Sequence, residues 1–341
     1  MRIIQLLTTT TLSLSFALTA IAARAGAVWE DAPQWQVNPT HIGFSRAYGQ
    51  FAPRPLNLDD LTIGFEIEGH IHGTKEQWPQ FATSLIPAVE SSFQSSVVDL
   101  RGEGNLSRLI LNDGRSLLIK GDKSVKPPPG RTDVEINSPV MAYSNYRRQV
   151  RAFLPELRAK DFSFTRTSAT HVHVGYPFAM VSSAELILLN DLLHVLQKDL
   201  YRFFRPHSDR WFYISPIGST RQAYEKSKTL QLRDPLANLY YGTPQELAED
   251  LMYSDINPAV DIAVSLQAHG TIQLRLLNAS YDPEELILAA ELLARIIHGI
   301  HTHHPGLKNY LTTTPVTEIR LIEVARALGV PSFCYLALTG S

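Results

Sequence analysis

Residues 61–73, LTIGFEIEGHIHG, alternate strictly between apolar and polar side chains. Successive side chains of an extended chain point to opposite faces, so this period of two predicts a β-strand with one buried face. Isoleucines and a phenylalanine occupy the buried face, and the other face carries Glu66, Glu68, His70 and His72. A strand that is apolar on one side has to pack that side against another layer of structure.

Three later segments, TDVEINSPV, THVHVG and GTIQLR, repeat the alternation with valine, isoleucine or leucine on one face. The polar faces of the four strands carry, in chain order, Glu66 and Glu68, then Glu135, then His171 and His173, then Gln273 and Arg275. A solvated sheet face is the ordinary place for polar side chains in such strands. Three carboxylates and two imidazoles with one arginine, gathered on one face, would instead repel each other unless cations lay among the carboxylates.

Helical patterns separate these strands. We expect helices over 74–93, broken up by Pro79 and Pro87, over 143–160 with Ser144 as cap, and over 182–204 with a serine cap. Further helices are expected over 243–251, after Asp282, and over 314–329. Residues 107–125 predict a hairpin that turns at Asn112, Asp113 and Gly114. The predicted fold class is α+β, with an antiparallel sheet and one domain over residues 60–341 behind an irregular lead-in over 28–59.

Residues 1–27 differ from the rest, with Arg2 ahead of a mostly apolar run, no acidic residue and small residues at the end. This pattern is typical of an export signal, which predicts a periplasmic or secreted protein; an organellar transit peptide is the alternative. No later run is apolar for the roughly 18 residues that a membrane span requires.

Composition excludes several classes of protein. Lysine and arginine total 31 against 33 acidic residues, so nothing indicates bulk binding to nucleic acid. The single cysteine, Cys334, rules out an intrachain disulfide and a cysteine-based zinc site. Oxygen and imidazole ligands suit Mg²⁺ or Mn²⁺ better.

The ordered motifs GFEIEG, GDKSV, VEINSP, THVHVG, a leucine-rich helix leading to SDR, and GTIQLR carry a resemblance. Over roughly residues 60–300 the chain resembles the amidoligase family related to glutamine synthetase and glutamate-cysteine ligase. The resemblance implies a glutamine-synthetase-like fold, a curved antiparallel sheet with helices on its outer face. It also implies an enzyme that joins a carboxylate to an amine with ATP and Mg²⁺ or Mn²⁺, through an acyl phosphate.

The resemblance assigns roles position by position. Its implied metal ligands are Glu66, Glu68, Glu135 and Gln273. Its implied catalytic residues are Arg275, His173 and Arg210, and its implied nucleotide contacts are Arg275, His173 and His171. Phosphoryl transfer agrees with such a set, because it needs metals bridging phosphate oxygens and arginine on the developing charge.

One departure from the family pattern leaves alternatives open. Gln273 stands where relatives have a glutamate, so it brings a neutral oxygen in place of a charged ligand. A non-catalytic exported binding protein derived from the same fold is therefore one alternative, and a metal-dependent hydrolase using His171 and His173 is another. The histidines of HGIHTHHPG, at 298, 301, 303 and 304, are better explained by the end of a helix than by a metal site.

Overall fold

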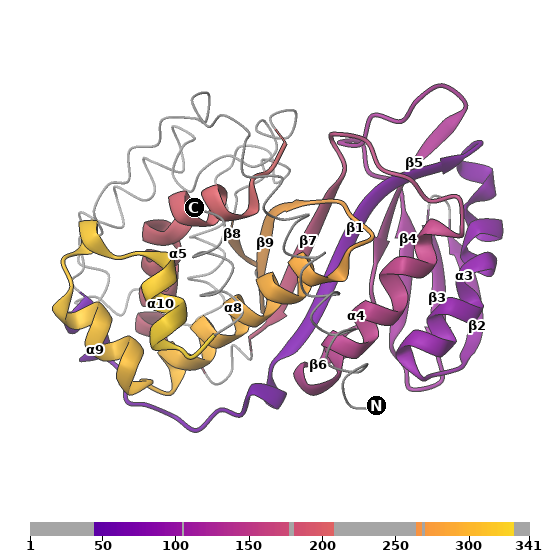
Figure 1. Cartoon of the computed structure of the whole chain (residues 1–341). Helices are drawn as coiled ribbons and strands as arrows, with labels where there is room; N and C mark the ends of the chain where they lie inside the picture. The colour runs from indigo at the N-terminus through magenta and orange to yellow at the C-terminus, as the bar shows by residue number, and fades with distance from the viewer. Residues whose placement is uncertain (1–43, 104–105, 177–180, 208–263, 268–269, 331–341) are drawn as a thin grey trace, which may run out of the picture.

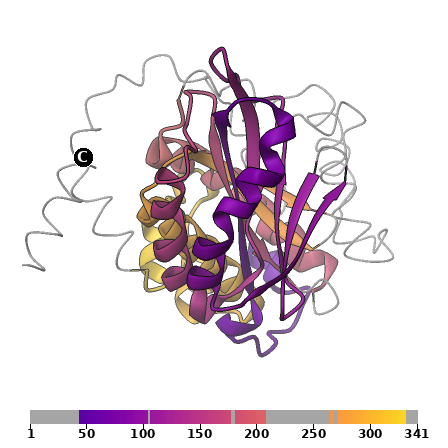
Figure 2. The same cartoon turned by 90° about the vertical axis from the view of Figure 1, so that its right-hand side faces the viewer.

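The computed structural model describes residues 44–103, 106–176, 181–207, 264–267 and 270–330, and these residues form a layer of strands against a layer of helices (Figure 1, Figure 2). The strands are β1 (Thr62–His72), β2 (Val97–Glu103), β3 (Leu106–Leu111), β4 (Ser116–Lys120), β5 (Arg131–Asn137), β6 (Met141–Ala142), β7 (Ala169–Gly175), β8 (Val264–Gln267) and β9 (Thr271–Asn278).

The nine strands of the described residues belong to one antiparallel sheet. Their order is β2-β3-β4-β5-β1-β7-β9-β8, and the short β6 pairs with the beginning of β1. The four strands with alternating polar faces, β5, β1, β7 and β9, are therefore direct neighbours, although they come from distant parts of the chain. This order brings their polar side chains together without any contribution from the outer strands.

Four of the described helices, α3 (Trp78–Phe93), α4 (Tyr143–Arg158), α5 (Ser183–Phe204) and α8 (Pro283–His301), cover one face of the sheet. The shorter α2 (Phe44–Tyr48), α9 (Pro305–Thr313) and α10 (Leu321–Ala327) pack against other helices. Contacts to the strands come from α3 on β2 to β4, α4 on β1 and β6, α8 on β7 and β9, and α5 on β8 and β9. Among the described helices, none is long and apolar enough to cross a membrane.

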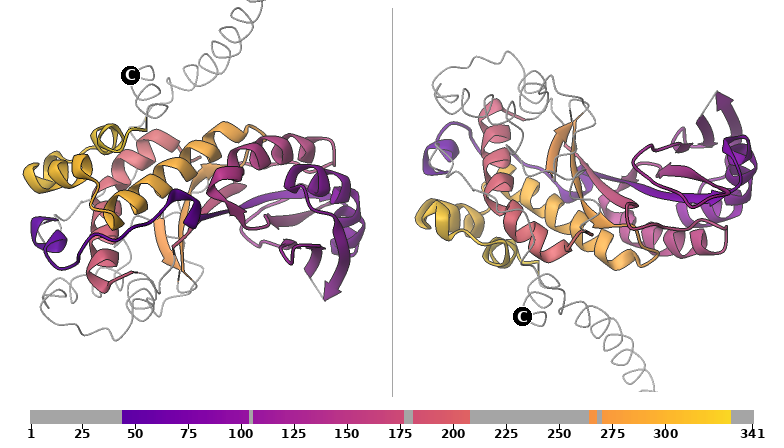
Figure 3. Two further views of the ribbon diagram at one scale, coloured as in Figure 1. Left: turned by 90° about the horizontal axis from the view of Figure 1, so that it is seen from below. Right: turned by 90° about the horizontal axis from the view of Figure 1, so that it is seen from above.

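The core lies between these two layers. The odd-numbered residues of β1, including Ile63, Phe65 and Ile67, are fully buried, and the Phe65 ring packs against Phe153 of α4 with 6.1 Å between ring centroids. Burial of such side chains is the main favourable contribution to folding. Both edges of the sheet bend away from the helices, so the opposite face, with the even-numbered residues of β1, is concave (Figure 3).

The alternating segments are strands β1, β5, β7 and β9, as their sequences predict, and the 112–114 turn joins β3 to β4. Two helix starts are also confirmed. Ser182 accepts a hydrogen bond from the backbone N–H of Glu185, and Asp282 accepts one from Glu284, so each side chain satisfies an otherwise unpaired N–H group of its helix.

Other predictions are wrong. Ser144 does not cap α4, which begins at Tyr143 with Ala142 before it. Pro79 and Pro87 do not interrupt α3, since Pro79 lies in its first turn, where no N–H partner is lost, and Pro87 is accommodated inside the helix. The last helix, α10, begins only at Leu321, after a 3-10 turn over Val316–Glu318.

Several elements have no counterpart in the sequence-based predictions. They are β2, β6, β8, α9, the helix α2 within the predicted irregular lead-in, and a 3-10 turn at Leu58–Asp60. The connection from α2 to β1 runs along the lower edge of the molecule (Figure 1). The predicted leader over 1–27, Arg210, Cys334 and the predicted helix over 243–251 lie outside the described residues.

Candidate active site

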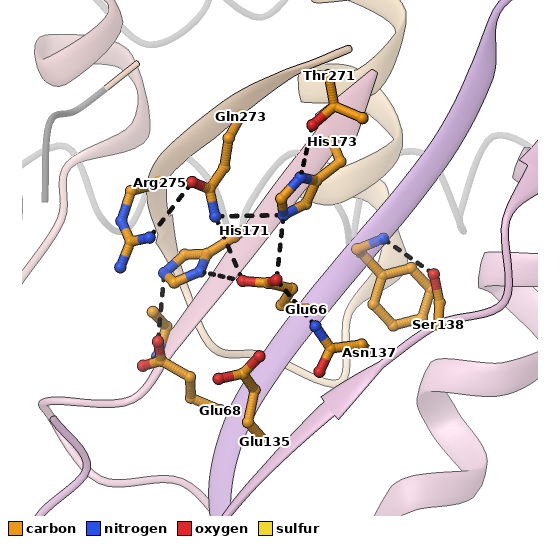
Figure 4. A network of polar contacts seen from close by, with 12 residues as sticks. Glu66, Glu68, Glu135, Asn137, Ser138, His171, His173, Thr271, Gln273 and Arg275 are labelled. Carbon is orange, nitrogen blue, oxygen red and sulfur yellow. Dashed lines mark hydrogen bonds and ion pairs between the residues drawn. The ribbon is translucent and has the colours of Figure 1, made fainter. Parts of the chain in front are cut away.

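Strand register places the polar side chains of four strands side by side on the concave face. Glu66 of β1 is paired with Asn137 of β5 on one side and with His171 of β7 on the other. Glu68 lies opposite Glu135, and further pairing between β7 and β9 sets His173 opposite Gln273. Directly opposed residues have Cβ atoms about 5 Å apart, so their side chains can interact. Figure 4 shows the resulting network.

The carboxylate of Glu66 is the centre of this network. Its Oε2 lies 2.9 Å from His171 Nδ1 and accepts a hydrogen bond of 3.3 Å from the Gln273 amide, while its Oε1 accepts one of 2.8 Å from Asn137 and lies 3.4 Å from His173 Nε2. Burial would raise the pKa of Glu66, but the hydrogen bonds to His171 and His173 outweigh it and hold the pKa well below its usual range. Glu66 is therefore ionised at neutral pH.

His171 connects two carboxyl groups. Its Nδ1 faces Glu66 at 2.9 Å, its Nε2 lies 3.3 Å from Glu68 Oε1, and its side chain is only 3% exposed. A neutral imidazole donates from one nitrogen only. Pairing of both ring nitrogens with carboxyl oxygens therefore requires an additional proton, on His171 itself or on Glu68.

Glu68 is buried and contacts a residue of the β4–β5 connection. It accepts a 3.0 Å hydrogen bond from the backbone N–H of Ala169 and shares a hydrogen bond with Asp122. Burial would raise the pKa of Asp122, but hydrogen bonds from Ser124 and from Glu68 lower it. Two carboxyl groups can only hydrogen-bond to each other through a proton. Asp122, which belongs to the GDKSV motif, is thus also part of the cluster.

Glu135 is paired with a lysine. Lys120 of β4 lies opposite Glu135 in the register, and its Nζ is 3.0 Å from Glu135 Oε1. Burial, and then the negative charge of Glu66, raise the pKa of Glu135 to about 7, while Lys120 opposes this shift. Glu135 therefore changes its charge near neutral pH and Lys120 supplies a cation within the site. Lys120 was not among the residues predicted from sequence.

Gln273 lies between the acidic centre and an arginine. Its Oε1 accepts a 3.3 Å hydrogen bond from Arg275, and its Nε2 donates to Glu66 and lies 3.2 Å from His173 Nε2. His173 in turn contacts Thr271 at 3.4 Å through Nδ1. The amide oxygen of Gln273 faces the arginine, so it would have to turn by a side-chain rotation to coordinate a cation beside Glu66.

Carboxylates are the ligands that hard divalent cations prefer, so the donor chemistry of the cluster fits Mg²⁺ or Mn²⁺. In the described part of the chain, however, no three histidine, aspartate or glutamate side chains converge as a ready metal site. The oxygens of Glu66 are instead engaged by imidazole and amide groups. Cation binding would replace the protons shared among His171, Glu68 and Asp122.

The structure thus brings together seven of the eight residues predicted for the site. They are Glu66, Glu68, Glu135, His171, His173, Gln273 and Arg275. The eighth, Arg210, lies outside the described residues. Asn137, Lys120 and Asp122 join the site without having been predicted. The register of β5 with β1 and β4 could have identified the first two, and Asp122 belongs to the GDKSV motif.

The histidine-rich segment lies elsewhere, in the helical layer. His298 and His301 belong to the last turns of α8, as predicted. His301 is buried, with its Nδ1 2.5 Å from Glu185 Oε1, and His304 caps α9. These positions explain the histidines by packing and capping.

Residues 59–297 match the model of a protein family described as "Putative amidoligase enzyme". The matched segment begins just before β1 and ends in α8, so it contains the whole sheet and every described residue of the site. The chain belongs to this amidoligase family. A search of curated proteins gives no significant match. The resemblance seen in the motifs is therefore confirmed, and the family description indicates a ligase-type enzyme.

Proposed function

We propose that the protein is an ATP- and magnesium-dependent ligase that joins a carboxylate to an amine through an acyl phosphate. The observation that carries the proposal is the concave-face cluster, in which Glu66, Glu68 and Glu135 lie beside Arg275 and Lys120. Phosphoryl transfer needs little covalent help from a protein but needs cations around the phosphate oxygens. Family membership supports the same chemistry.

Glu66, Glu68, Glu135 and Asp122 would hold the divalent ions, which on binding supply charge neutralisation for the phosphates of ATP. Arg275 lies beside the acidic centre, where its guanidinium would neutralise the transferring phosphoryl group. His171 and His173 would orient Glu66 through the hydrogen bonds that they already make.

The curved antiparallel sheet with helices on one face also supports a glutamine-synthetase-like fold, which we include in the proposal. In such an arrangement the substrate carboxylate would take the γ-phosphoryl group of ATP on the concave face, giving the acyl phosphate and releasing ADP. An incoming amine would then attack the acyl carbon and release phosphate. The proton that the amine loses would pass to a basic group outside the metal-coordinating carboxylates, such as the released phosphate.

The first test is thermal unfolding of the protein with Mg²⁺ or Mn²⁺, each with and without ATP. A ligand at about 100 times its dissociation constant stabilises the folded state by roughly 2.7 kcal/mol, which shifts the midpoint by a few degrees. We expect a shift that needs metal and nucleotide together and disappears in Glu68→Gln. Glu284→Gln, on the exposed side of α8, is the matched control and should keep the shift.

A second candidate function rests on Gln273. An amide at this position brings no charge to the acidic centre, and its oxygen faces Arg275 instead of the carboxylates. A non-catalytic exported protein that binds a small ligand on the concave face would need no charge there. The absence of any metal- and ATP-dependent shift, together with leader cleavage after about residue 27 in natively produced protein, would favour this function over the ligase.

A further inference from the structure

A pair of arginines lies on the same face as the active site, at the β2–β3 side of the sheet. Following directly opposed residues from strand to strand gives one continuous row across the concave face: Arg101, Arg108, Leu118, Asn137, Glu66 and His171. Arg101 and Arg108 are thus in line with the centre of the cluster.

Burial confirms which way Arg108 faces. On β3, the side chains on the opposite face from Arg108 are buried against the helical layer, where α3 covers this strand. They are Ser107, Leu109 and Leu111. Arg108 is exposed and therefore points away from α3. This is the direction in which Glu66 points from β1.

Two arginines directly opposite one another are unfavourable without an anion. Like charges at paired positions of an antiparallel sheet destabilise it. Asp99 compensates Arg101, with its Oδ2 2.7 Å from the guanidinium Nε. Among the described residues, no acidic or hydrogen-bonding partner is found for the guanidinium of Arg108. Arg108 therefore presents a planar, forked guanidinium, the form that binds oxyanions in a bidentate manner.

The distance between the arginine pair and Glu66 sets the length of a ligand that could contact both. Arg108 and Glu66 are three strand spacings apart along the row, about 14 Å for a flat sheet. Bending of the sheet toward its concave face shortens this separation (Figure 3). An extended segment of three residues spans at most about 10–11 Å. A substrate of that length could place one carboxyl group at the cluster and a second anionic group at the arginines.

We propose that Arg101 and Arg108 bind a second carboxylate of the carboxylate substrate, so that the enzyme selects elongated dianionic molecules such as short acidic peptides. This inference rests on the proposed function for the identity of the reacting end. The binding site itself needs only the arginine pair and its alignment with Glu66.

Calorimetric titration with the tripeptide Glu-Ala-Ala and with its C-terminal amide tests the proposal. The two probes differ only in the second carboxylate. Wild-type protein should bind the free acid about tenfold more tightly than the amide, the contribution of one charge-assisted pair. Arg108→Gln should lose this preference. Arg148→Gln, an exposed arginine on α4 in the helical layer, should retain it.

Three results would overturn the proposal. They are a free-acid preference that survives in Arg108→Gln, equal binding of acid and amide by the wild type, and no binding of either at millimolar concentration. A second titration, with Mg²⁺ and ATP, measures nucleotide affinity, and here Arg108→Gln should bind nucleotide like the wild type. Weakened nucleotide binding with an unchanged peptide preference would assign the arginines to phosphate instead. A peptide preference without any ATP binding would reject the ligase but not the anion site.

Discussion

Hydrogen-bond donors from two helices converge on the buried carboxylate of Glu291 in α8. The hydroxyl groups of Tyr143 and Tyr146 donate to it at 2.9 and 3.2 Å, Arg295 donates at 3.0 Å, and Arg147 forms an ion pair. This contact connects α4 to α8, the helices that cover the apolar faces of β1 and β7. Glu291→Gln changes the charge with almost no change in shape.

The substitution should be costly because every partner of Glu291 is a donor. An amide keeps one acceptor oxygen and directs its NH₂ group at donors on the other side. Tyr146 is fully buried, while Arg147 and Arg295 are partly exposed, at 49% and 34% of their side-chain surface. Hydrogen bonds to charged groups contribute about 1.5–3 kcal/mol each, and solvent screening reduces the arginine contributions, so we expect a loss of about 2–4 kcal/mol.

Urea unfolding at neutral pH measures this loss, and α8 provides its own control. Glu284 also pairs with an arginine of α4, Arg151, but both side chains are about half exposed. Glu284→Gln should therefore cost less than about 1 kcal/mol. In both variants, the slope of the free energy of unfolding against urea concentration should equal that of the wild type. Equal losses in the two variants would refute the reasoning that burial decides the strength of the α4–α8 contacts.

Raising the pH from about 5 to about 8 in chelator-containing buffer should lower the free energy of unfolding by about 1–3 kcal/mol through Glu135. Its pKa rises from 4.5 to about 7 on folding, so the folded protein holds an extra proton that it loses as the pH rises. The free energy of unfolding of Glu135→Gln, measured in urea, should lack this dependence on pH. The same pH dependence as in the wild type would contradict the prediction. Gly69→Ala should destabilise by about 1–3 kcal/mol, because a Cβ atom would lie 2.6 Å from the Phe162 ring; a wild-type melting temperature would exclude this clash. Glu185→Gln should cost about 2–3 kcal/mol by weakening its buried contact to His301, and calorimetry that shows no loss would mean that the contact is not stabilising.

The two-residue alternation of apolar and polar side chains identified the strands that carry the site. β1, β5, β7 and β9 each have one buried and one polar face, so their sequences alternate clearly. β2 escaped prediction because it lies at the edge of the sheet, where VVDLRGE is largely exposed and does not alternate. The prediction that Pro87 breaks its helix was wrong for a different reason, because tertiary packing of α3 tolerates a proline that local helix propensity disfavours.

Periodicity also revealed which residues share a face but not which of them meet. Glu66 and His171 belong to strands more than a hundred residues apart, and only the register sets their 2.9 Å contact. The contribution of Lys120 has the same origin, because its position opposite Glu135 depends on how β4 aligns with β5. Asp122 follows β4 in a turn, and its place beside Glu68 depends on how that turn folds back onto the sheet.

The alternation of β1 also limits how the length of this segment can change. Loss or gain of a single residue between Ile63 and Glu68 would exchange the two faces of everything beyond it, and carboxylates would enter the core while isoleucines entered the site. Loss or gain of two residues would keep both faces and move only the register with β5 and β7. Natural or engineered variants of this protein should therefore differ here by substitution or by pairs of residues, unless a β-bulge absorbs a single extra residue.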